Sequence, residues 1–211
     1  MSTLDIAVVG SGYMGGGIAQ VLALAGHTVR IADVSAEIAQ QNLERLLGET
    51  AQFVADGLFP EDAVERVRAH LSAAESIEAA VADADFIEEA VPEKLEIKHA
   101  TLRRISEAAR PDAVIGSNTS TILIESLAEA VVGPERFLGV HFSNPAPFIP
   151  GVELIPHPTT NEHAIEVGET VVAATGKQSA RVKDSTGFVL NRLQYAPVSY
   201  THLTLPTILR V

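Results

Sequence analysis

Residues 4–33 read LDIAVVGSGYMGGGIAQVLALAGHTVRIAD, and this stretch decides the fold. The apolar run at 4–9 predicts a short buried strand that leads directly into the glycine pattern G-x-G-x-x-G at 10–15. Apolar residues then recur at the helical spacing 18, 21, 22 and 25, until Gly26 ends the helix. A second strand at 28–32 ends at Asp33. A strand, a glycine-rich turn, a helix and a second strand in this order predict a βαβ unit that binds a dinucleotide.

Each glycine of the pattern has its own physical role in such a unit. Gly10 permits the tight turn, Gly12 lets the backbone approach a pyrophosphate, and Gly15 lets the helix pack closely on the strand. Asp33 can accept hydrogen bonds from a ribose 2′-hydroxyl, and its charge would repel the 2′-phosphate of NADP, so the sequence favours NAD. The alternative is a glycine-rich turn that binds nothing. We assign the cofactor contacts of this unit to Gly10, Gly12, Tyr13, Met14, Gly15 and Asp33.

The overall composition restricts the class of protein. Of the 211 residues 46% are hydrophobic, which is enough for a packed core, and 15 Lys and Arg against 27 Asp and Glu give a net charge of −12. This acidity argues against nucleic acid or an anionic membrane as a partner. The sequence contains no cysteine, no metal-ligand spacing, no signal peptide and no apolar run long enough to span a bilayer. We therefore expect a cytoplasmic protein without a metal.

The rest of the chain alternates between helical and strand patterns. The pattern predicts helices over 35–56, 60–71, 76–82, 93–109, 122–131 and 161–175, and strands over 84–91, 113–116, 137–142, 152–155 and 179–182. Alternation of this kind predicts an α/β fold of the Rossmann type, with a doubly wound, mostly parallel sheet. The stretch after Asp33 is longer than a crossover needs, so we expect a helical insertion after the second strand.

Among the seven histidines, His141 is the candidate general base, because it lies near the carboxyl end of a predicted strand, where open α/β sheets bind their ligands. Glu153 on the next strand could fix the tautomer of its imidazole. The alternative is a histidine satisfied by backbone groups beside an exposed glutamate. Ser120 belongs to a polar strand-to-helix junction at 117–120 that faces either a ligand or the helix it caps. Surface or loop positions are expected for His27, His70, His99, His157 and His163.

Residues 4–196 resemble the NAD-binding domain of the L-3-hydroxyacyl-CoA dehydrogenase family in the order of their motifs. The matching features are the glycine pattern 10–15, Asp33, 89–93 (EAVPE) with Lys98, 117–120 (SNTS), 141–145 (HFSNP), 152–155 (VELI), and 184–192 from Asp184 through Gly187-Phe188 to Asn191-Arg192. The resemblance implies oxidation of a 3-hydroxyacyl-CoA to the 3-ketoacyl-CoA with NAD, as in fatty-acid β-oxidation.

The same resemblance implies residue roles that the spacing alone does not give. His141 would act as the general base and Glu153 would orient and polarise it. Ser120 and Asn191 would hold the substrate oxygen near the base. The remaining contacts to NAD would come from Glu93, Lys98, Ser120 and Asn144.

The resemblance also implies domain limits. We expect the NAD-binding domain at 1–185, the start of a truncated helical C-terminal domain at 186–196, and a non-native tail at 197–211. In the family that C-terminal domain closes the substrate cleft and carries most of the dimer interface, so the full-length parent would be a homodimer. We expect the fragment to bind NADH but to turn over poorly.

One departure from the family leaves the substrate open. The acyl-CoA enzymes place Ser and Lys on the helix after the ribose-binding acid, whereas here that helix carries Glu44, Glu49 and Asp56, with Arg45 its only cation. The segments 148–158 and 191–196 also resemble a sister branch that contains L-gulonate 3-dehydrogenase and lambda-crystallin. The alternatives are therefore a dehydrogenase of a free 3-hydroxy acid such as L-gulonate, and an NAD-binding protein without catalytic activity.

Overall fold

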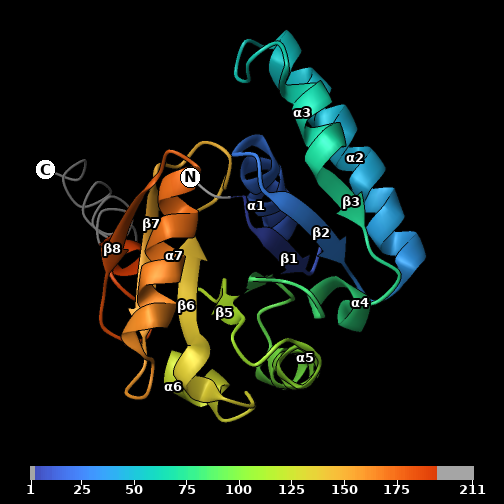
Figure 1. Ribbon diagram of the computed structural model, residues 1–211. Coiled ribbons are helices and arrows are strands. Elements are labelled where there is room, and N and C mark those ends of the chain that lie inside the picture. Colours follow the sequence, from blue (N-terminus) through green and yellow to red (C-terminus); the bar gives the residue numbers. More distant parts are fainter. Residues whose placement is uncertain (1–2, 194–211) are drawn as a thin grey trace, which may run out of the picture.

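An eight-stranded sheet runs through the centre of this computed structural model, which describes residues 3–193 (Figure 1). Its strands are β1 Asp5–Val9, β2 Thr28–Ala32, β3 Leu71–Ala73, β4 Phe86–Glu89, β5 Val114–Ser117, β6 Phe137–Phe142, β7 Gly151–Pro156 and β8 Gln178–Arg181. They lie in the order β3-β2-β1-β4-β5-β6-β7-β8, and every neighbouring pair is parallel except β6 and β7. The predicted doubly wound, mostly parallel sheet is confirmed.

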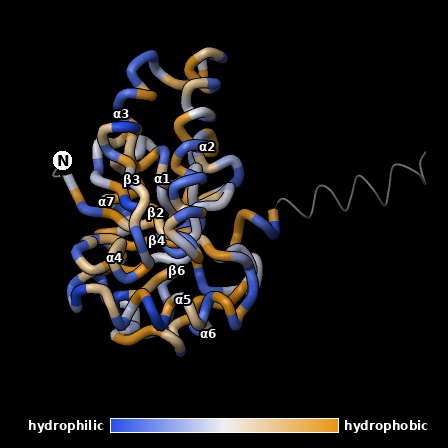
Figure 2. The backbone as a smooth tube through the Cα atoms, turned by 90° about the vertical axis from the view of Figure 1, so that its right-hand side faces the viewer, coloured by the Kyte–Doolittle hydropathy of each residue, from blue (hydrophilic) through white to orange (hydrophobic). Residues whose placement is uncertain are grey.

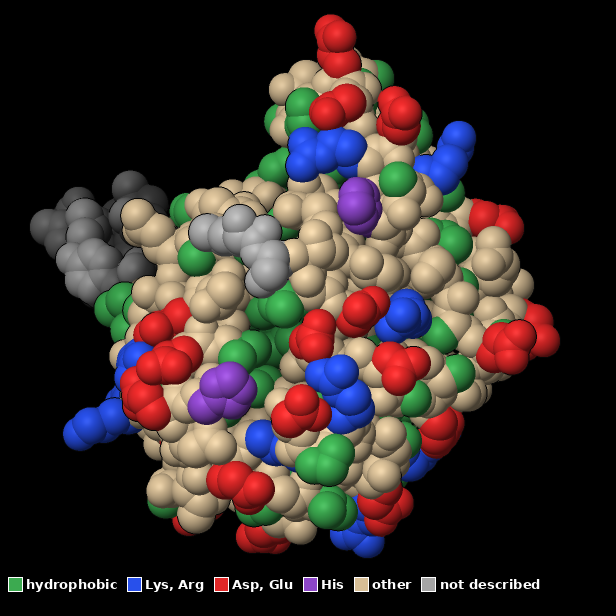
Figure 3. Space-filling view, viewed as in Figure 1, with side chains coloured by type: hydrophobic (Ala, Val, Ile, Leu, Met, Phe, Trp, Pro, Cys, Tyr) green, Lys and Arg blue, Asp and Glu red, His purple; other side chains and the backbone are tan. Residues whose placement is uncertain are grey.

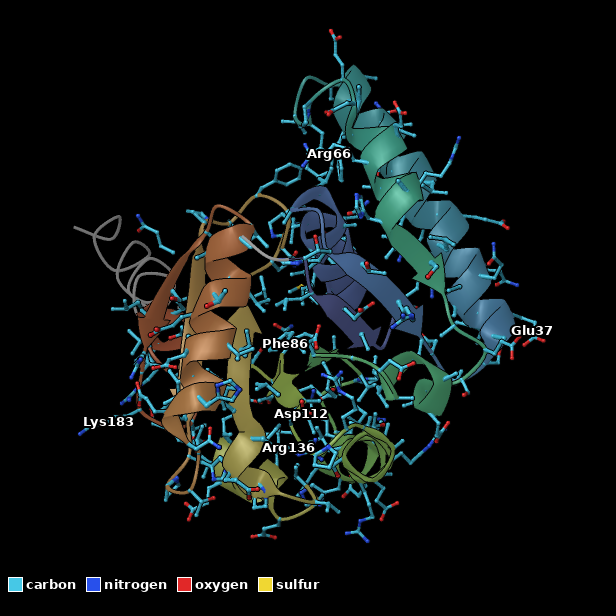
Figure 4. The ribbon with its side chains drawn as sticks, in the orientation of Figure 1. Glu37, Arg66, Phe86, Asp112, Arg136 and Lys183 are labelled. Carbon is cyan, nitrogen blue, oxygen red and sulfur yellow. The ribbon has the colours of Figure 1, made fainter. Side chains whose placement is uncertain are left out.

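Helices cover both faces of the sheet. They are α1 Tyr13–Leu24, α2 Ala36–Ala55, α3 Ala63–His70, α4 Ile77–Val81, α5 Leu95–Ala108, α6 Ile124–Ala128 and α7 Glu162–Ala174, with a 3-10 turn η1 at Pro134–Arg136. Helices α1 and α7 pack on one face, around the fully buried Phe86 labelled in Figure 4. Helices α4, α5 and α6 pack on the other, where Ile87 and Ile115 are fully buried. The two faces of each central strand therefore contribute to two separate cores.

Polar residues define where three of the helices begin. Ser35, Ser76 and Asn161 each accept, through the side chain, a hydrogen bond from the backbone N–H three residues further on. Such caps satisfy N–H groups that have no partner within the helix. The predicted starts of α2, α4 and α7 are confirmed.

Helices α2 and α3 pack against each other and project from the sheet as an arm, which we define as residues 36–70 (Figures 1 and 2). The arm is the helical insertion expected after β2. The predicted helix over 60–71 is wrong at both ends, because α3 begins at Ala63 and Leu71 starts the short strand β3, which pairs with β2. Leu71 fits the inward face of the helix equally well, so the strand depends on a partner distant in sequence.

The carboxyl-terminal part of the described chain returns to the sheet. Phe188 is fully buried in the core formed with α4, α5 and α6, and the backbone is helical from Leu190 to Leu193. The predicted tail at 197–211 lies outside the described residues, and the domain boundary at 185 stays a prediction. Within residues 3–193 no helix combines the length and the hydropathy of a membrane span.

Candidate functional site

The glycine loop after β1, residues 10–15, is packed against backbone at Gly10 and Gly15 and is open at Gly12. A Cβ atom placed on Gly15 would lie 1.8 Å from the carbonyl oxygen of Gly10, so only glycine lets α1 pack this closely on the strand. Gly10 itself has φ of +96° and its Cβ would lie 2.7 Å from the backbone of Ala90. A Cβ on Gly12, in contrast, would meet nothing within 4 Å. The backbone at Gly12 is therefore free to be approached from outside.

A cavity of about 650 Å³ opens at this loop. It lies at the carboxyl ends of β1, β2, β4 and β5, where the strand order reverses between β1 and β4. Open α/β sheets bind their ligands at such a switch point. Its walls include the sequence-predicted Gly10, Gly12, Tyr13, Met14, Asp33, Glu93 and Ser120, together with Ile77, Ile97, Thr101 and Arg104, which the sequence did not single out.

Asp33 lies on the wall of the cavity and is held by the glycine loop. Its Oδ2 atom accepts hydrogen bonds from the N–H of Ser11 at 2.8 Å and from the hydroxyl of Ser11 at 2.6 Å. Among the described residues that line the cavity, Arg104 is the one cation, and Glu78 accepts two hydrogen bonds from it at 2.9 and 3.1 Å. The wall therefore carries a fixed carboxylate and a cation that is already paired.

Glu93 ties the loop after β4 to the loop after β5. Its Oε1 atom accepts hydrogen bonds from the hydroxyl of Thr119 at 2.7 Å and from the N–H groups of Ser120 and Thr121 at 2.9 Å each. Burial raises the pKa of Glu93, but the hydrogen bond from Thr119 and the positive charge of Lys98, together with those two N–H groups, outweigh burial and lower it. The carboxylate of Glu93 thus fixes the backbone on which Ser120 stands.

Lys98 lies behind Glu93 and is not among the residues that line the cavity, and its contact with the cofactor stays a prediction. Its side chain is only 1% exposed, and its Nζ donates to Glu89 Oε1 at 2.8 Å and to the carbonyl oxygen of Val91 at 3.2 Å. A further contact of 3.5 Å reaches Glu93 Oε2. Because α5 turns this side chain inward against β4, its ammonium lies between the carboxylates of Glu89 and Glu93.

His141 and Glu153 are direct partners across the antiparallel pair β6–β7. The Nδ1 atom of His141 lies 2.8 Å from Glu153 Oε2, and both residues are buried. A carboxylate can only accept, so we assign the imidazole proton to Nδ1, which leaves Nε2 as an acceptor. The hydroxyl of Ser120, 3.2 Å away, donates to this Nε2. Ser120 therefore joins the histidine pair to the cavity that it also lines.

A backbone segment that the sequence did not assign holds the second oxygen of Glu153. Glu153 Oε1 accepts hydrogen bonds from the N–H groups of Val189 at 2.9 Å and Leu190 at 3.0 Å. Phe188 precedes them with φ of +47°, and its ring centroid lies 5.6 Å from that of His141. In the sequence only the pair Gly187-Phe188 marks this turn. Residue spacing cannot predict its contact with Glu153 on β7, because the two segments lie far apart in the chain.

The predicted asparagines take different positions. Asn191 Nδ2 donates to the backbone carbonyl of Ser120 at 2.9 Å, so the structure brings these two predicted residues together. Asn144 is exposed and is not among the residues that line the cavity, and its contact with the cofactor stays a prediction. Asn118, for which no separate role was predicted, accepts a hydrogen bond from the N–H of Phe142 at 2.8 Å and so fixes the end of β6.

Two of the histidines expected at surface or loop positions lie in loops, as predicted, but are buried there. His27 is 3% exposed and accepts a hydrogen bond from the N–H of Leu4 through Nδ1, and His157 is 7% exposed and donates to the carbonyl of Pro134 through Nε2. Both occur in loops whose packing comes from distant segments. Within residues 3–193 no group of three or more His, Asp or Glu side chains gathers in a way that could hold a metal ion.

Comparison with known proteins gives a consistent result. The family profile described as 3-hydroxyacyl-CoA dehydrogenase, NAD binding domain, matches residues 5–185. A 3-hydroxybutyryl-CoA dehydrogenase from Bradyrhizobium diazoefficiens is 36% identical over 95% of this chain and 68% of its own length. The mitochondrial hydroxyacyl-coenzyme A dehydrogenase of Sus scrofa is 33% identical over 89% of this chain, which spans 62% of that relative.

The solved structures agree. The crystal structure of an (S)-3-hydroxybutyryl-CoA dehydrogenase from Ralstonia eutropha superposes with a TM-score of 0.90 at 29% identity, covering 99% of this chain and 73% of that one. These relatives extend beyond the region that this chain matches. The fold is thus shared over nearly the whole of this chain.

Proposed function

This chain belongs to the 3-hydroxyacyl-CoA dehydrogenase family through that family's NAD-binding domain, and we propose that it takes part in oxidising a 3-hydroxyacyl-CoA to the 3-ketoacyl-CoA with NAD. One observation carries the proposal. His141 Nδ1 lies 2.8 Å from Glu153 Oε2, and its Nε2 lies 3.2 Å from the hydroxyl of Ser120, which lines the cavity. A general base therefore lies beside the place where a cofactor and a substrate could meet.

The residues at the glycine loop fit a dinucleotide. The open space beside Gly12 lets a diphosphate approach the backbone, and Asp33 offers an acceptor to the ribose on the same wall. Tyr13, Met14 and Glu93 would complete the contacts, with Asn144 further out. Bound NAD would supply the acceptor for the hydride that leaves carbon 3 of the substrate.

The proton of the substrate hydroxyl would go to His141. Its Nε2 carries the free lone pair, and Glu153 stabilises the imidazolium that forms when Nε2 takes the proton. Ser120 and Asn191 would hold the substrate oxygen, with the hydroxyl of Ser120 moving from Nε2 to that oxygen. The residues present can therefore remove the proton while the hydride departs, which gives the ketone.

Two measurements on the 211-residue chain test this function. We expect calorimetry to show binding of NADH with a preference over NADPH, and we expect slow turnover of acetoacetyl-CoA with NADH in single-turnover assays at high protein concentration. His141→Gln should lower that rate by about 10²–10⁴-fold and leave NADH binding unchanged. His163→Gln, at an exposed position on α7, is the control. An unaltered rate in His141→Gln would remove the histidine from the mechanism.

A second candidate substrate is a free 3-hydroxy acid, and the charge of the arm favours it. Glu44 and Asp56 on the arm are exposed, and Arg45 is already bound to Glu49 at 2.6 Å. Figure 3 shows further acidic side chains at the tip of the arm. An acidic arm is a poor surface for the phosphates of CoA. Oxidation rates for 3-hydroxybutyryl-CoA and for free L-gulonate separate the two, and a faster reaction with the free acid would replace the first proposal.

The protein acts on a small molecule, as its family does. The homodimer expected of the full-length parent and the expected cytoplasmic location stay predictions, and the relative from Sus scrofa is a mitochondrial protein by its name. Light scattering of the full-length parent would test the dimer.

A further inference from the structure

We propose that Arg45, Asn42 and Ser11 are positioning residues for Asp33, and that through it they set the selectivity of the cavity for NADH over NADPH. The proposal rests on the function proposed above. It gives the arm a part in cofactor recognition, because Asn42 and Arg45 lie on α2, whereas Ser11 belongs to the glycine loop.

A continuous series of hydrogen bonds joins the arm to the carboxylate. Arg45 Nε donates to Asn42 Oδ1 at 3.2 Å. Asn42 Nδ2 donates to Ser11 Oγ at 2.9 Å. Ser11 Oγ then donates to Asp33 Oδ2 at 2.6 Å. At the other end, Glu49 accepts from Arg45 Nη1 at 2.6 Å and holds the guanidinium in place.

Each hydrogen bond in this series is donated toward Asp33, and Arg45 sets that direction. A guanidinium can only donate, so it selects the oxygen of the Asn42 amide and turns the amide nitrogen toward Ser11. The lone pair of Ser11 Oγ then accepts from Asn42, which leaves the hydroxyl proton to point at Asp33. Without Arg45 the amide could rotate, and its oxygen would compete with Asp33 for that proton.

The consequence for Asp33 is that few acceptor positions remain. A carboxylate offers about four lone-pair positions. Ser11 uses two of them on Oδ2, and the N–H of Val34 uses one on Oδ1 at 2.8 Å. The position left on Oδ1 can accept one ribose hydroxyl. The carboxylate is thus fixed beside the place where a 2′-phosphate would come.

Arg45 also holds the backbone of the glycine loop. Its Nη2 donates to the carbonyl oxygens of Ser11 at 3.1 Å and Gly12 at 3.3 Å. Because a Cβ on Gly12 would meet nothing within 4 Å, Arg45 holds this backbone without filling the open side of Gly12. Arg45 therefore fixes both the glycine loop, which would contact the diphosphate, and Asp33, which would contact the adenosine ribose.

The test compares dissociation constants for NADH and NADPH in Ser11→Ala, Arg45→Met and Arg45→Lys. We expect weaker NADH binding by about tenfold in each, as for loss of a hydrogen bond to a charged group, and a smaller change for NADPH. Lysine keeps the charge but cannot donate to Asn42, Ser11 and Gly12 together, so Arg45→Lys separates geometry from charge. Arg68→Met, an exposed arginine on α3, is the matched control. Thermal melting confirms that each variant is folded.

The double variant Ser11→Ala, Arg45→Met gives the sharpest result. Because both residues act on Asp33 through one series of bonds, its effect on the NADH:NADPH ratio should equal that of either single variant. Additive effects, or an unaltered ratio in all variants of a chain that binds NADH, would overturn the positioning role and leave the proposed function intact. Failure of the unmodified chain to bind NADH would overturn both.

Discussion

The buried carboxyl of Glu88 should make the free energy of unfolding fall as the pH rises, and Glu88→Gln should remove this dependence. The carboxyl lies in the centre of β4, is fully buried, and has no hydrogen-bond partner among the described residues. It rests over Gly116, where a Cβ atom would lie 2.5 Å from its Oε2. Burial raises the pKa of Glu88 well above its ordinary value of 4.5, the charge of Glu89 raises it further, and Lys98 lowers it in part.

The sign of the effect follows from this shift. Below pH 4.5 Glu88 is protonated in both the folded and the unfolded protein, so it does not make the stability depend on pH. Because its pKa is higher in the folded protein, the free energy of unfolding falls as the pH rises from there toward the folded-state pKa. While the group is protonated when folded and ionised when unfolded, the free energy of unfolding falls by about 1.4 kcal/mol per pH unit. Glutamine has nearly the same shape and does not titrate. Its advantage over glutamate should therefore grow by the same amount per pH unit.

Urea unfolding followed by circular dichroism at pH 5, 6, 7 and 8 measures this advantage. We expect Glu88→Gln and the unmodified chain to have similar stability at pH 5, and the advantage of the variant to grow from pH 5 to pH 8 by up to about 1.4 kcal/mol per pH unit. Glu129→Gln, at an exposed position after α6, is the control and should give a difference that does not change with pH. A constant difference for Glu88→Gln would show that the folded protein carries this carboxyl ionised, and the reasoning would be wrong.

Four further variants test the site and the residues that support it. Gly15→Ala should lower the free energy of unfolding by about 1–3 kcal/mol in urea titrations, because its Cβ would lie 1.8 Å from Gly10, whereas Gly12→Ala should keep the stability and weaken NADH binding at least tenfold by calorimetry. Glu153→Gln should slow the reduction of acetoacetyl-CoA about 10²-fold or more with unchanged NADH affinity, since an amide that donates to Nδ1 would move the proton to Nε2. Arg136→Met should cost at least about 2 kcal/mol in urea, because this guanidinium, labelled in Figure 4, donates to the carbonyls of Arg110, Ala113, Ser106 and Val132.

The parts of the site that sequence reasoning found are those set by local pattern. The glycine loop and Asp33 belong to one βαβ unit, in which the spacing fixes the geometry. His141 and Glu153 were found as residues of neighbouring strands, and the pairing of β6 with β7 brings them together. Their functional roles stay predictions.

The parts that were missed depend on contacts between distant segments. The N–H groups of Val189 and Leu190 reach Glu153 from more than 30 positions away, and no side chain marks them in the sequence. In the sequence nothing distinguishes Lys98 from a lysine at the surface of a helix. Its ion pair with Glu89 depends on the packing of α5 on β4. Backbone donors and buried charges of this kind have no periodic signal.

The direct register of His141 with Glu153 makes their separation independent of the segment that connects them. The distance is set by the spacing of two hydrogen-bonded strands, so residues 143–150 between β6 and β7 form a loop whose length and composition can change without moving the pair. The separation of His141 and Glu153 should therefore persist in variants whose segment 143–150 is altered.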